Sequence, residues 1–175
     1  MTVLRGGGAL SAEVTQRGGE ASVSTPGFGP VMAGDLYARA WFNISSRHTL
    51  EAATLLIVGE DAAPWSHVAF EVSEDGHAAV WIHNTATQHV SPAVVVPIDT
   101  WFCAELHLRI GETDGAVDLW LDGELAVAES GVDTATGAGY DRIAVGVPYS
   151  TFDQRRFRVY VDEVAVTTAP LPCDC

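Results

Sequence analysis

The residues best suited to chemistry lie at alternate positions of two segments. Tyr37, Arg39 and Trp41 follow one another in the segment 36–45, and Trp81 and His83 do so in 77–84. Alternate residues of a β-strand point to the same face of a sheet. Aromatic rings can stack on the apolar faces of sugars, while planar polar side chains hydrogen-bond the hydroxyl groups. The five side chains are therefore candidates for a carbohydrate-binding face, and the alternative is that they pack under covering loops.

Alternation of apolar and polar residues recurs along the chain and predicts about a dozen short strands. They cover 12–16, 21–25, 36–45, 54–60, 67–73, 77–84, 93–97, 101–110, 117–123, 124–128, 142–147 and 156–166. Three Asp-Gly steps, at 75–76, 114–115 and 122–123, predict tight hairpins whose residues have positive φ. We expect an all-β, two-sheet antiparallel sandwich that forms a single domain over 1–170, followed by a cysteine-containing tail at 171–175.

Composition narrows the function. The 175 residues include 23 acidic and 9 basic side chains, all nine of them arginine, for a net charge of −14. A general nucleic-acid binder or anionic-membrane binder needs a basic surface. We therefore do not expect this acidic protein to belong to either class. No apolar run approaches the roughly 20 residues of a membrane span. The opening residues lack a basic and then apolar stretch, so we expect no signal peptide in this sequence.

Three cysteines leave one thiol over after a single pairing. Cys173 and Cys175 are too close to bridge comfortably to each other. We therefore favour a disulfide from Cys103 to Cys173, with the alternative of three reduced thiols left open. A disulfide would place the protein in an oxidising compartment.

The stretch WFCAELHLRIGETDGAVDLWLDGELAV, which begins at Trp101, resembles the central hairpin of concanavalin A-like lectin/glucanase jelly rolls. It is most similar to the laminin-G-like domains of secreted bacterial proteins. RVYVDEVAV, at 158–166, resembles the closing strand of that fold, and GGGALSAEV and LYARAWFNIS resemble its first and third strands. The resemblance implies two sheets, one of them concave, with ligands on the concave face or its rim. It also implies that Cys103 pairs with a cysteine after the last strand, either Cys173 or Cys175.

Members of this family include lectins, hydrolases and polysaccharide lyases. The hydrolases carry Glu-x-Asp-x-x-Glu on one strand, and the run EVSED at 71–75 has the wrong spacing and falls on a turn. The lyases use an arginine, a histidine and a tyrosine, which Arg39, His83 and Tyr149 match in part, although Trp81 stands where those enzymes have glutamine. The resemblance alone does not choose among these functions. Because the catalytic motifs are missing or partial, we expect non-catalytic polysaccharide binding on the concave sheet face of an extracellular or cell-surface protein, either on its own or as part of a larger exported chain. The alternatives are a lyase and a protein–protein adhesion module.

Related sandwiches also hold a structural calcium beside an aspartate of the last strand, which Asp162 matches by position. Calcium takes carboxylate and carbonyl oxygens, and carbonyls at 6–8 would complete the site. The alternative is an exposed aspartate on an edge strand. Next to it, Arg155, Arg156 and Arg158 form a local basic segment that either binds uronates or sulfates, or protects an edge strand by its charge.

Overall fold

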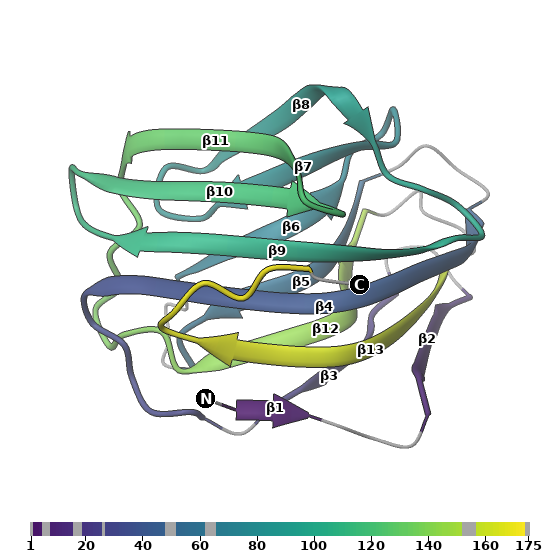
Figure 1. Ribbon diagram of the computed structural model, residues 1–175, viewed down its shortest axis with the longest axis horizontal. Helices are drawn as coiled ribbons and strands as arrows, with labels where there is room; N and C mark the ends of the chain where they lie inside the picture. The colour runs from purple at the N-terminus through teal and green to yellow at the C-terminus, as the bar shows by residue number, and fades with distance from the viewer. Residues whose placement is uncertain are drawn as a thin grey trace.

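The protein folds into two antiparallel β-sheets that pack face to face (Figure 1). The computed structural model describes residues 2–4, 8–15, 19–25, 27–47, 52–61, 66–151 and 157–173. These residues contain no helix, so none of them forms a helix that could cross a membrane. The predicted all-β, two-sheet architecture is confirmed.

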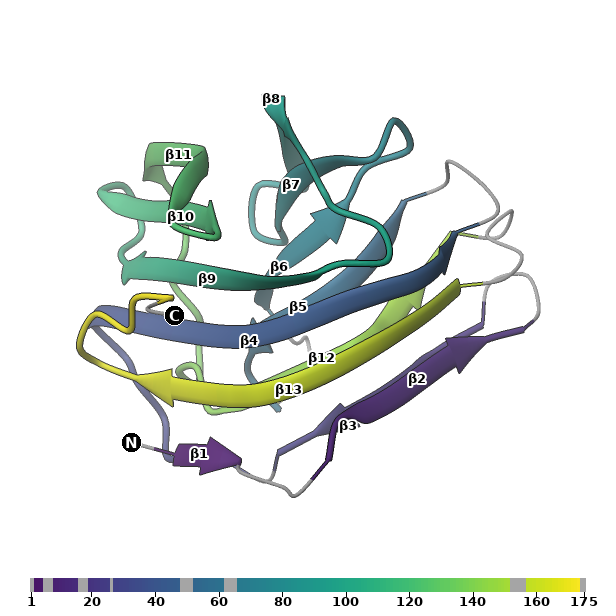
Figure 2. The ribbon, with the colours of Figure 1, turned by 45° about the vertical axis from the view of Figure 1, so that its right-hand side comes forward.

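Sheet A has seven strands and sheet B has six. Sheet A runs in the order β1 (Thr2–Leu4), β13 (Phe157–Thr167), β4 (Gly34–Arg47), β9 (Trp101–Ile110), β10 (Gly115–Leu121) and β11 (Glu124–Val132), and β2 (Leu10–Val14) also pairs with β13. Sheet B runs in the order β3 (Ala21–Ser24), β12 (Arg142–Ser150), β5 (Ala53–Gly59), β6 (His67–Val72), β7 (His77–Ile82) and β8 (Thr87–Val95). Figure 2 shows the two layers obliquely, with β4 and β13 of sheet A in front of β5 and β12 of sheet B.

The core lies between the two sheets and is made by the inward residues of each alternating strand. On β4 these are Leu36, Ala38, Ala40, Phe42 and Ile44, all at most 1% exposed. The ring of Phe42 lies 5.9 Å from those of Phe70 in sheet B and Phe102 in sheet A, which joins the two layers. Because successive side chains of a strand alternate, the intervening aromatic and polar residues point away from the core.

Two of the three Asp-Gly steps contain residues with left-handed backbone, whereas the third needs glycine for close packing of two chain segments. Asp122 and Gly123 have φ of 49° and 81°, and Gly76 has φ of 87°, as hairpin turns require. Gly115 is not left-handed, so its predicted positive φ was wrong, although the predicted hairpin between β9 and β10 does form. A Cβ at Gly115 would collide with Thr134 Oγ1 and the carbonyl of Val132, so glycine is needed there for close approach of two chain segments.

The chain after β13 turns back over the outer face of sheet A and is tied to it (Figure 1). A disulfide joins Cys103 of β9 to Cys173, which confirms that pairing; Cys175 lies outside the described residues. Arg39 Nη1 donates a hydrogen bond to the carbonyl of Pro172 at 2.9 Å. We call residues 168–173 the tail strap. It helps to explain why Cys103, although its side chain points outward, is completely buried.

Candidate functional site

The five predicted ligand residues lie on two different sheets. Tyr37, Arg39 and Trp41 are on the outer face of sheet A, whereas Trp81 and His83 are at the outer face of sheet B. Alternation gives the face of a strand correctly, but it does not tell which of two sheets the strand joins. The five residues therefore cannot line one site.

On sheet A, the side chain of Tyr37 packs against neighbouring side chains. Its ring stacks on that of His107 with centroids 4.4 Å apart and planes inclined by 15°. The His107 ring nitrogens lie 2.8 Å from Asp35 Oδ1 and 3.0 Å from Asp118 Oδ2. Burial, followed by the charges of Asp35, Glu105 and Asp118, raises the pKa of the Tyr37 phenol. This arrangement favours packing over ligand binding at Tyr37.

The guanidinium of Arg39 also interacts with other groups of the protein. Besides its bond to the tail strap, its Nη2 lies 3.9 Å from Glu163 Oε2. Its side chain is only 19% exposed. Trp41, two residues further along β4, is half-buried.

The outer face of sheet B is hollowed instead. A pocket of about 610 Å³ opens over β5, β6 and β7. Trp81 and the 52%-exposed Tyr149 are among its walls. The strand register places Ala69 between Ile57 and Trp81, and its small side chain leaves the space between these two larger ones. The described residues that line it are Glu20, Ala52, Thr54, Ile57, His67, Glu71, Trp81, Gln88, Pro148 and Tyr149.

Glu71 lies at the bottom of this pocket and is only 8% exposed. Its Oε1 accepts a hydrogen bond from Thr54 Oγ1 at 2.9 Å, and its Oε2 accepts one from Gln88 Nε2 at 2.7 Å. Burial raises the pKa of the Glu71 carboxyl, and the two hydrogen bonds partly oppose that rise. Glu71 is thus a fixed carboxylate with two uncharged partners.

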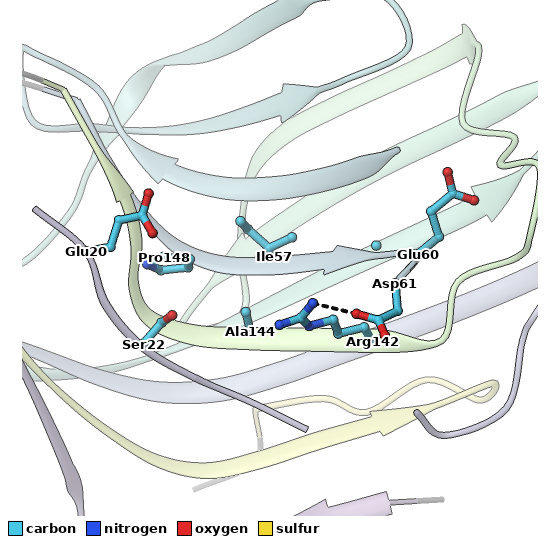
Figure 3. A pocket seen from close by; sticks show the side chains of 9 residues that line it. Glu20, Ser22, Ile57, Glu60, Asp61, Arg142, Ala144 and Pro148 are labelled. Atoms are coloured by element: carbon cyan, nitrogen blue, oxygen red, sulfur yellow. Dashed lines mark hydrogen bonds and ion pairs between the residues drawn. The ribbon is translucent and has the colours of Figure 1, made fainter. Parts of the chain in front are cut away.

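A second pocket of about 370 Å³ adjoins the first and shares Glu20, Ile57 and Pro148 with it. We call the two together the sheet-B groove. At the far end of the second pocket, Arg142 Nη1 donates to Asp61 Oδ1 at 2.6 Å, as Figure 3 shows. The groove crosses the strands from β7 to β12, so it is elongated and open.

Solved structures of other proteins share the fold of this chain. No protein-family model matches the sequence, and no curated protein matches it either. Among solved structures, "Cellulose induced protein, Cip1" superposes with a TM-score of 0.64 and 19% identity, covering 91% of this chain and 90% of that one. An endo-β-1,4-glucuronan lyase from the fungus Trichoderma reesei gives 0.69 and 14%, covering 95% and 83%. The alginate lyase Aly36B gives 0.61 and 7%, covering 90% and 80%.

These structures are concanavalin A-like jelly-roll sandwiches. The present chain has the same jelly-roll fold. Identities this low establish the fold alone, so the functional argument has to come from the groove itself.

Within this jelly roll, the three lyase-like residues do not assemble. Tyr149 lines the sheet-B groove, and His83 lies beside it, with its ring 4.9 Å from that of the groove residue His67. Arg39 is on the opposite sheet. An arginine that neutralises a uronate in the groove therefore has to come from another position, and among the described residues Arg142 lines the groove.

Several groove residues were missed by sequence reasoning. The acidic run 71–75 is predicted to fall on a turn, but the turn begins only after Val72, and Glu71 lies in β6, within the strand predicted over 67–73. Gln88 was missed because β8 begins at Thr87, well before the apolar run that marked it in the sequence. The available signal was the alternation of Glu71 with the buried residues Phe70 and Val72.

The described residues do not assemble a calcium site around Asp162. Its Oδ1 accepts a hydrogen bond from the backbone N–H of Glu163 at 2.8 Å. Among the described residues, no three His, Cys, Asp or Glu side chains gather to hold a metal. Gly6 and Gly7 lie outside the described residues, so calcium stays a prediction.

Asp162 and Arg158 are also not on an edge strand, because β13 has β4 on one side and β1 and β2 on the other. That part of the prediction was wrong, since the N-terminal strands were not foreseen as its neighbours. Arg158 is bonded to Glu13 of β2, and this contact raises the pKa of its guanidinium. Arg155 and Arg156 lie outside the described residues.

Proposed function

We propose that this protein binds a polysaccharide, without catalysis, in the sheet-B groove. The observation that carries the proposal is the pairing of aromatic walls with polar groups in one open cavity: Trp81 and Tyr149 beside Thr54, Glu71 and Gln88. Aromatic rings stack on sugar C–H faces, while the polar groups can bond hydroxyls. A volume of about 610 Å³ is in the range of about 300–1,000 Å³ that ligand sites usually have.

An extracellular or cell-surface location is part of the same proposal. The Cys103–Cys173 disulfide supports it, because such bonds persist in oxidising compartments. The names of the structural neighbours also support a role in carbohydrate chemistry, since two of them are polysaccharide lyases.

Affinity electrophoresis against neutral and acidic polysaccharides, with calcium present, tests the proposal. We expect selective retardation by at least one of them. Trp81→Ala should weaken it about tenfold or more, since tenfold corresponds to about 1.4 kcal/mol and a tryptophan at the centre of a binding site can contribute about 2 kcal/mol. Trp120→Ala is the matched control, because Trp120 is also half-buried but lies on the outer face of sheet A.

Other outcomes would redirect the assignment. If Trp41→Ala removed retardation and Trp81→Ala did not, the site would be on sheet A. If no polysaccharide retarded the protein at all, the proposal would fail. An adhesion role like that of laminin-G-like domains would then be the better account.

Lyase activity is the second candidate, and the exposed Tyr149 in the groove is the observation that favours it. A tyrosine can act as the base that removes the proton from the ring carbon bearing the carboxylate of a uronate, when a cation neutralises that carboxylate. Arg142 in the groove is already bonded to Asp61. Under our proposal, glucuronan and alginate give no unsaturated product by ultraviolet absorbance. Turnover that disappears in Tyr149→Phe would establish the lyase in its place.

A further inference from the structure

The buried carboxylate of Glu71 is an unusual feature for the floor of a binding groove. Among the described residues, the side chains that hydrogen-bond it are Thr54 and Gln88, and both are uncharged. Removing a carboxylate from water without a positive partner costs free energy, and hydrogen bonds recover only part of that cost. A ligand that brings a positive charge to the floor of the pocket would offset the remainder.

The charges along the rest of the groove have the same sign. Arg142 is compensated within the protein, because its Nη1 donates to Asp61 and its Nη2 donates to Ser24 Oγ at 3.0 Å. Figure 3 shows the guanidinium directed toward Asp61 and the carboxylate of Glu20 beside Pro148 at the other end. Among the described lining residues, the other charged side chains are Glu20, Asp61 and Glu60, and both carboxylate oxygens of Glu60 accept backbone N–H bonds, from Ser66 and Ala138.

Among the described lining residues, the carboxylates of Glu20, Asp61 and Glu71 outnumber the single guanidinium of Arg142, so this part of the groove is negatively charged. Such a field repels a uronate polymer and attracts a cation. The aromatic wall at Trp81 remains available for the ring of a sugar.

We propose that the glycan recognised by the sheet-B groove carries protonated amines, as a polymer of 2-amino-2-deoxy sugars does. An ammonium group would meet the carboxylates of Glu71 and Glu20, while the sugar ring stacks on Trp81. This inference rests on the proposed function, since it names the chemical class of the ligand for the same groove.

The test is isothermal titration of the full chain with three oligosaccharides of equal length, at low salt and pH 6. They are a fully deacetylated glucosamine oligomer, its N-acetylated counterpart, which is neutral, and an oligoglucuronate. We expect the glucosamine oligomer to bind at least tenfold more tightly than the other two. Tighter binding of the neutral oligomer or of the glucuronate would overturn the inference but leave carbohydrate binding in place. Failure of all three, together with no retardation by any polysaccharide, would remove the proposed function itself.

Variants separate recognition in the groove from general attraction of a cation to an acidic protein. Glu71→Gln keeps the shape of the side chain and should weaken binding of the glucosamine oligomer about tenfold. Glu20→Gln, at an exposed position that is safe for folding, should weaken it several-fold. Glu124→Gln makes the same charge change at the start of β11 in sheet A and should alter binding less than twofold. Equal losses in all three variants would show attraction by net charge alone and would overturn the inference.

Discussion

Glu71 has an ionisable side chain that points out of the sheet and is nevertheless buried. Its position on β6 faces away from the core, yet the surrounding groove leaves it only 8% exposed. Thr54 and Gln88 hold both oxygens and fix the carboxylate in one orientation. Burial in this setting disfavours the charged form, which is why the pKa is raised. A fixed acceptor of this kind is useful for recognition, but it costs stability whenever it ionises.

This cost gives a prediction about stability and pH. The folded pKa of Glu71 is above its ordinary value of 4.5, so the folded state retains the proton longer than the unfolded state. Stability from this group is fully present below pH 4.5 and is lost as pH rises through the raised folded pKa. In Glu71→Gln, the decrease in unfolding free energy over this window should be smaller than in the wild type, as measured by urea denaturation at a series of pH values.

Other titratable groups line the same pocket, namely His67, Glu20 and Tyr149. They are unchanged in the variant, so the difference between the two proteins isolates Glu71. Glu124→Gln serves as the control, and its unfolding free energy should depend on pH as that of the wild type does. An identical slope in Glu71→Gln and the wild type would mean that ionisation of Glu71 costs nothing.

At the scale of elements, the tail strap is held by one covalent bond to β9. The disulfide closes a loop between residues 70 positions apart. Chain-entropy estimates for loops of this length are about 4 kcal/mol, and removal of native disulfides typically costs about 2–5 kcal/mol. We expect Cys173→Ser to lower the unfolding free energy by about 2–4 kcal/mol. Glycan binding should not change, because the strap lies on sheet A and the groove on sheet B.

Cys175→Ser is the matched control, and its denaturation midpoint should equal that of the wild type. Comparable losses in both variants would indicate that Cys175 takes part in the pairing. A loss of glycan binding in Cys173→Ser alone would place the binding face on sheet A.

The elements also show how far sequence reasoning reaches. The shared face of Tyr37, Arg39 and Trp41 on β4 was predicted correctly, because alternation is a local property with a period of two and the intervening residues of that strand are buried. The candidate site was not, because it depends on which strands become neighbours across the sheet. Ile57, Ala69 and Trp81 form one row only after β5, β6 and β7 have paired. The occupation of Arg39 by the tail strap is likewise a contact across 133 positions of the sequence.

The whole molecule carries a net charge of −14, which affects its stability beyond any one site. Like charges spread over a small sandwich repel one another and destabilise the compact state. Salt shortens the screening length from about 30 Å at 0.01 M to about 8 Å at 0.15 M. Salt also weakens ion pairs such as Arg142–Asp61 and Arg158–Glu13, but exposed pairs contribute only about 0–1 kcal/mol each.

We therefore expect the melting temperature to rise when sodium chloride is increased from 0.01 M to 0.15 M. A gain of about 1 kcal/mol corresponds to about 2–4 °C for a chain of this size, which differential scanning calorimetry resolves. The rise should be smaller at pH 5, where some carboxylates are protonated. The same salt should weaken binding of a glucosamine oligomer, so fold stability and amine recognition would respond in opposite directions. A melting temperature that falls with salt would mean that the local ion pairs, rather than the overall repulsion, dominate the electrostatics of this protein.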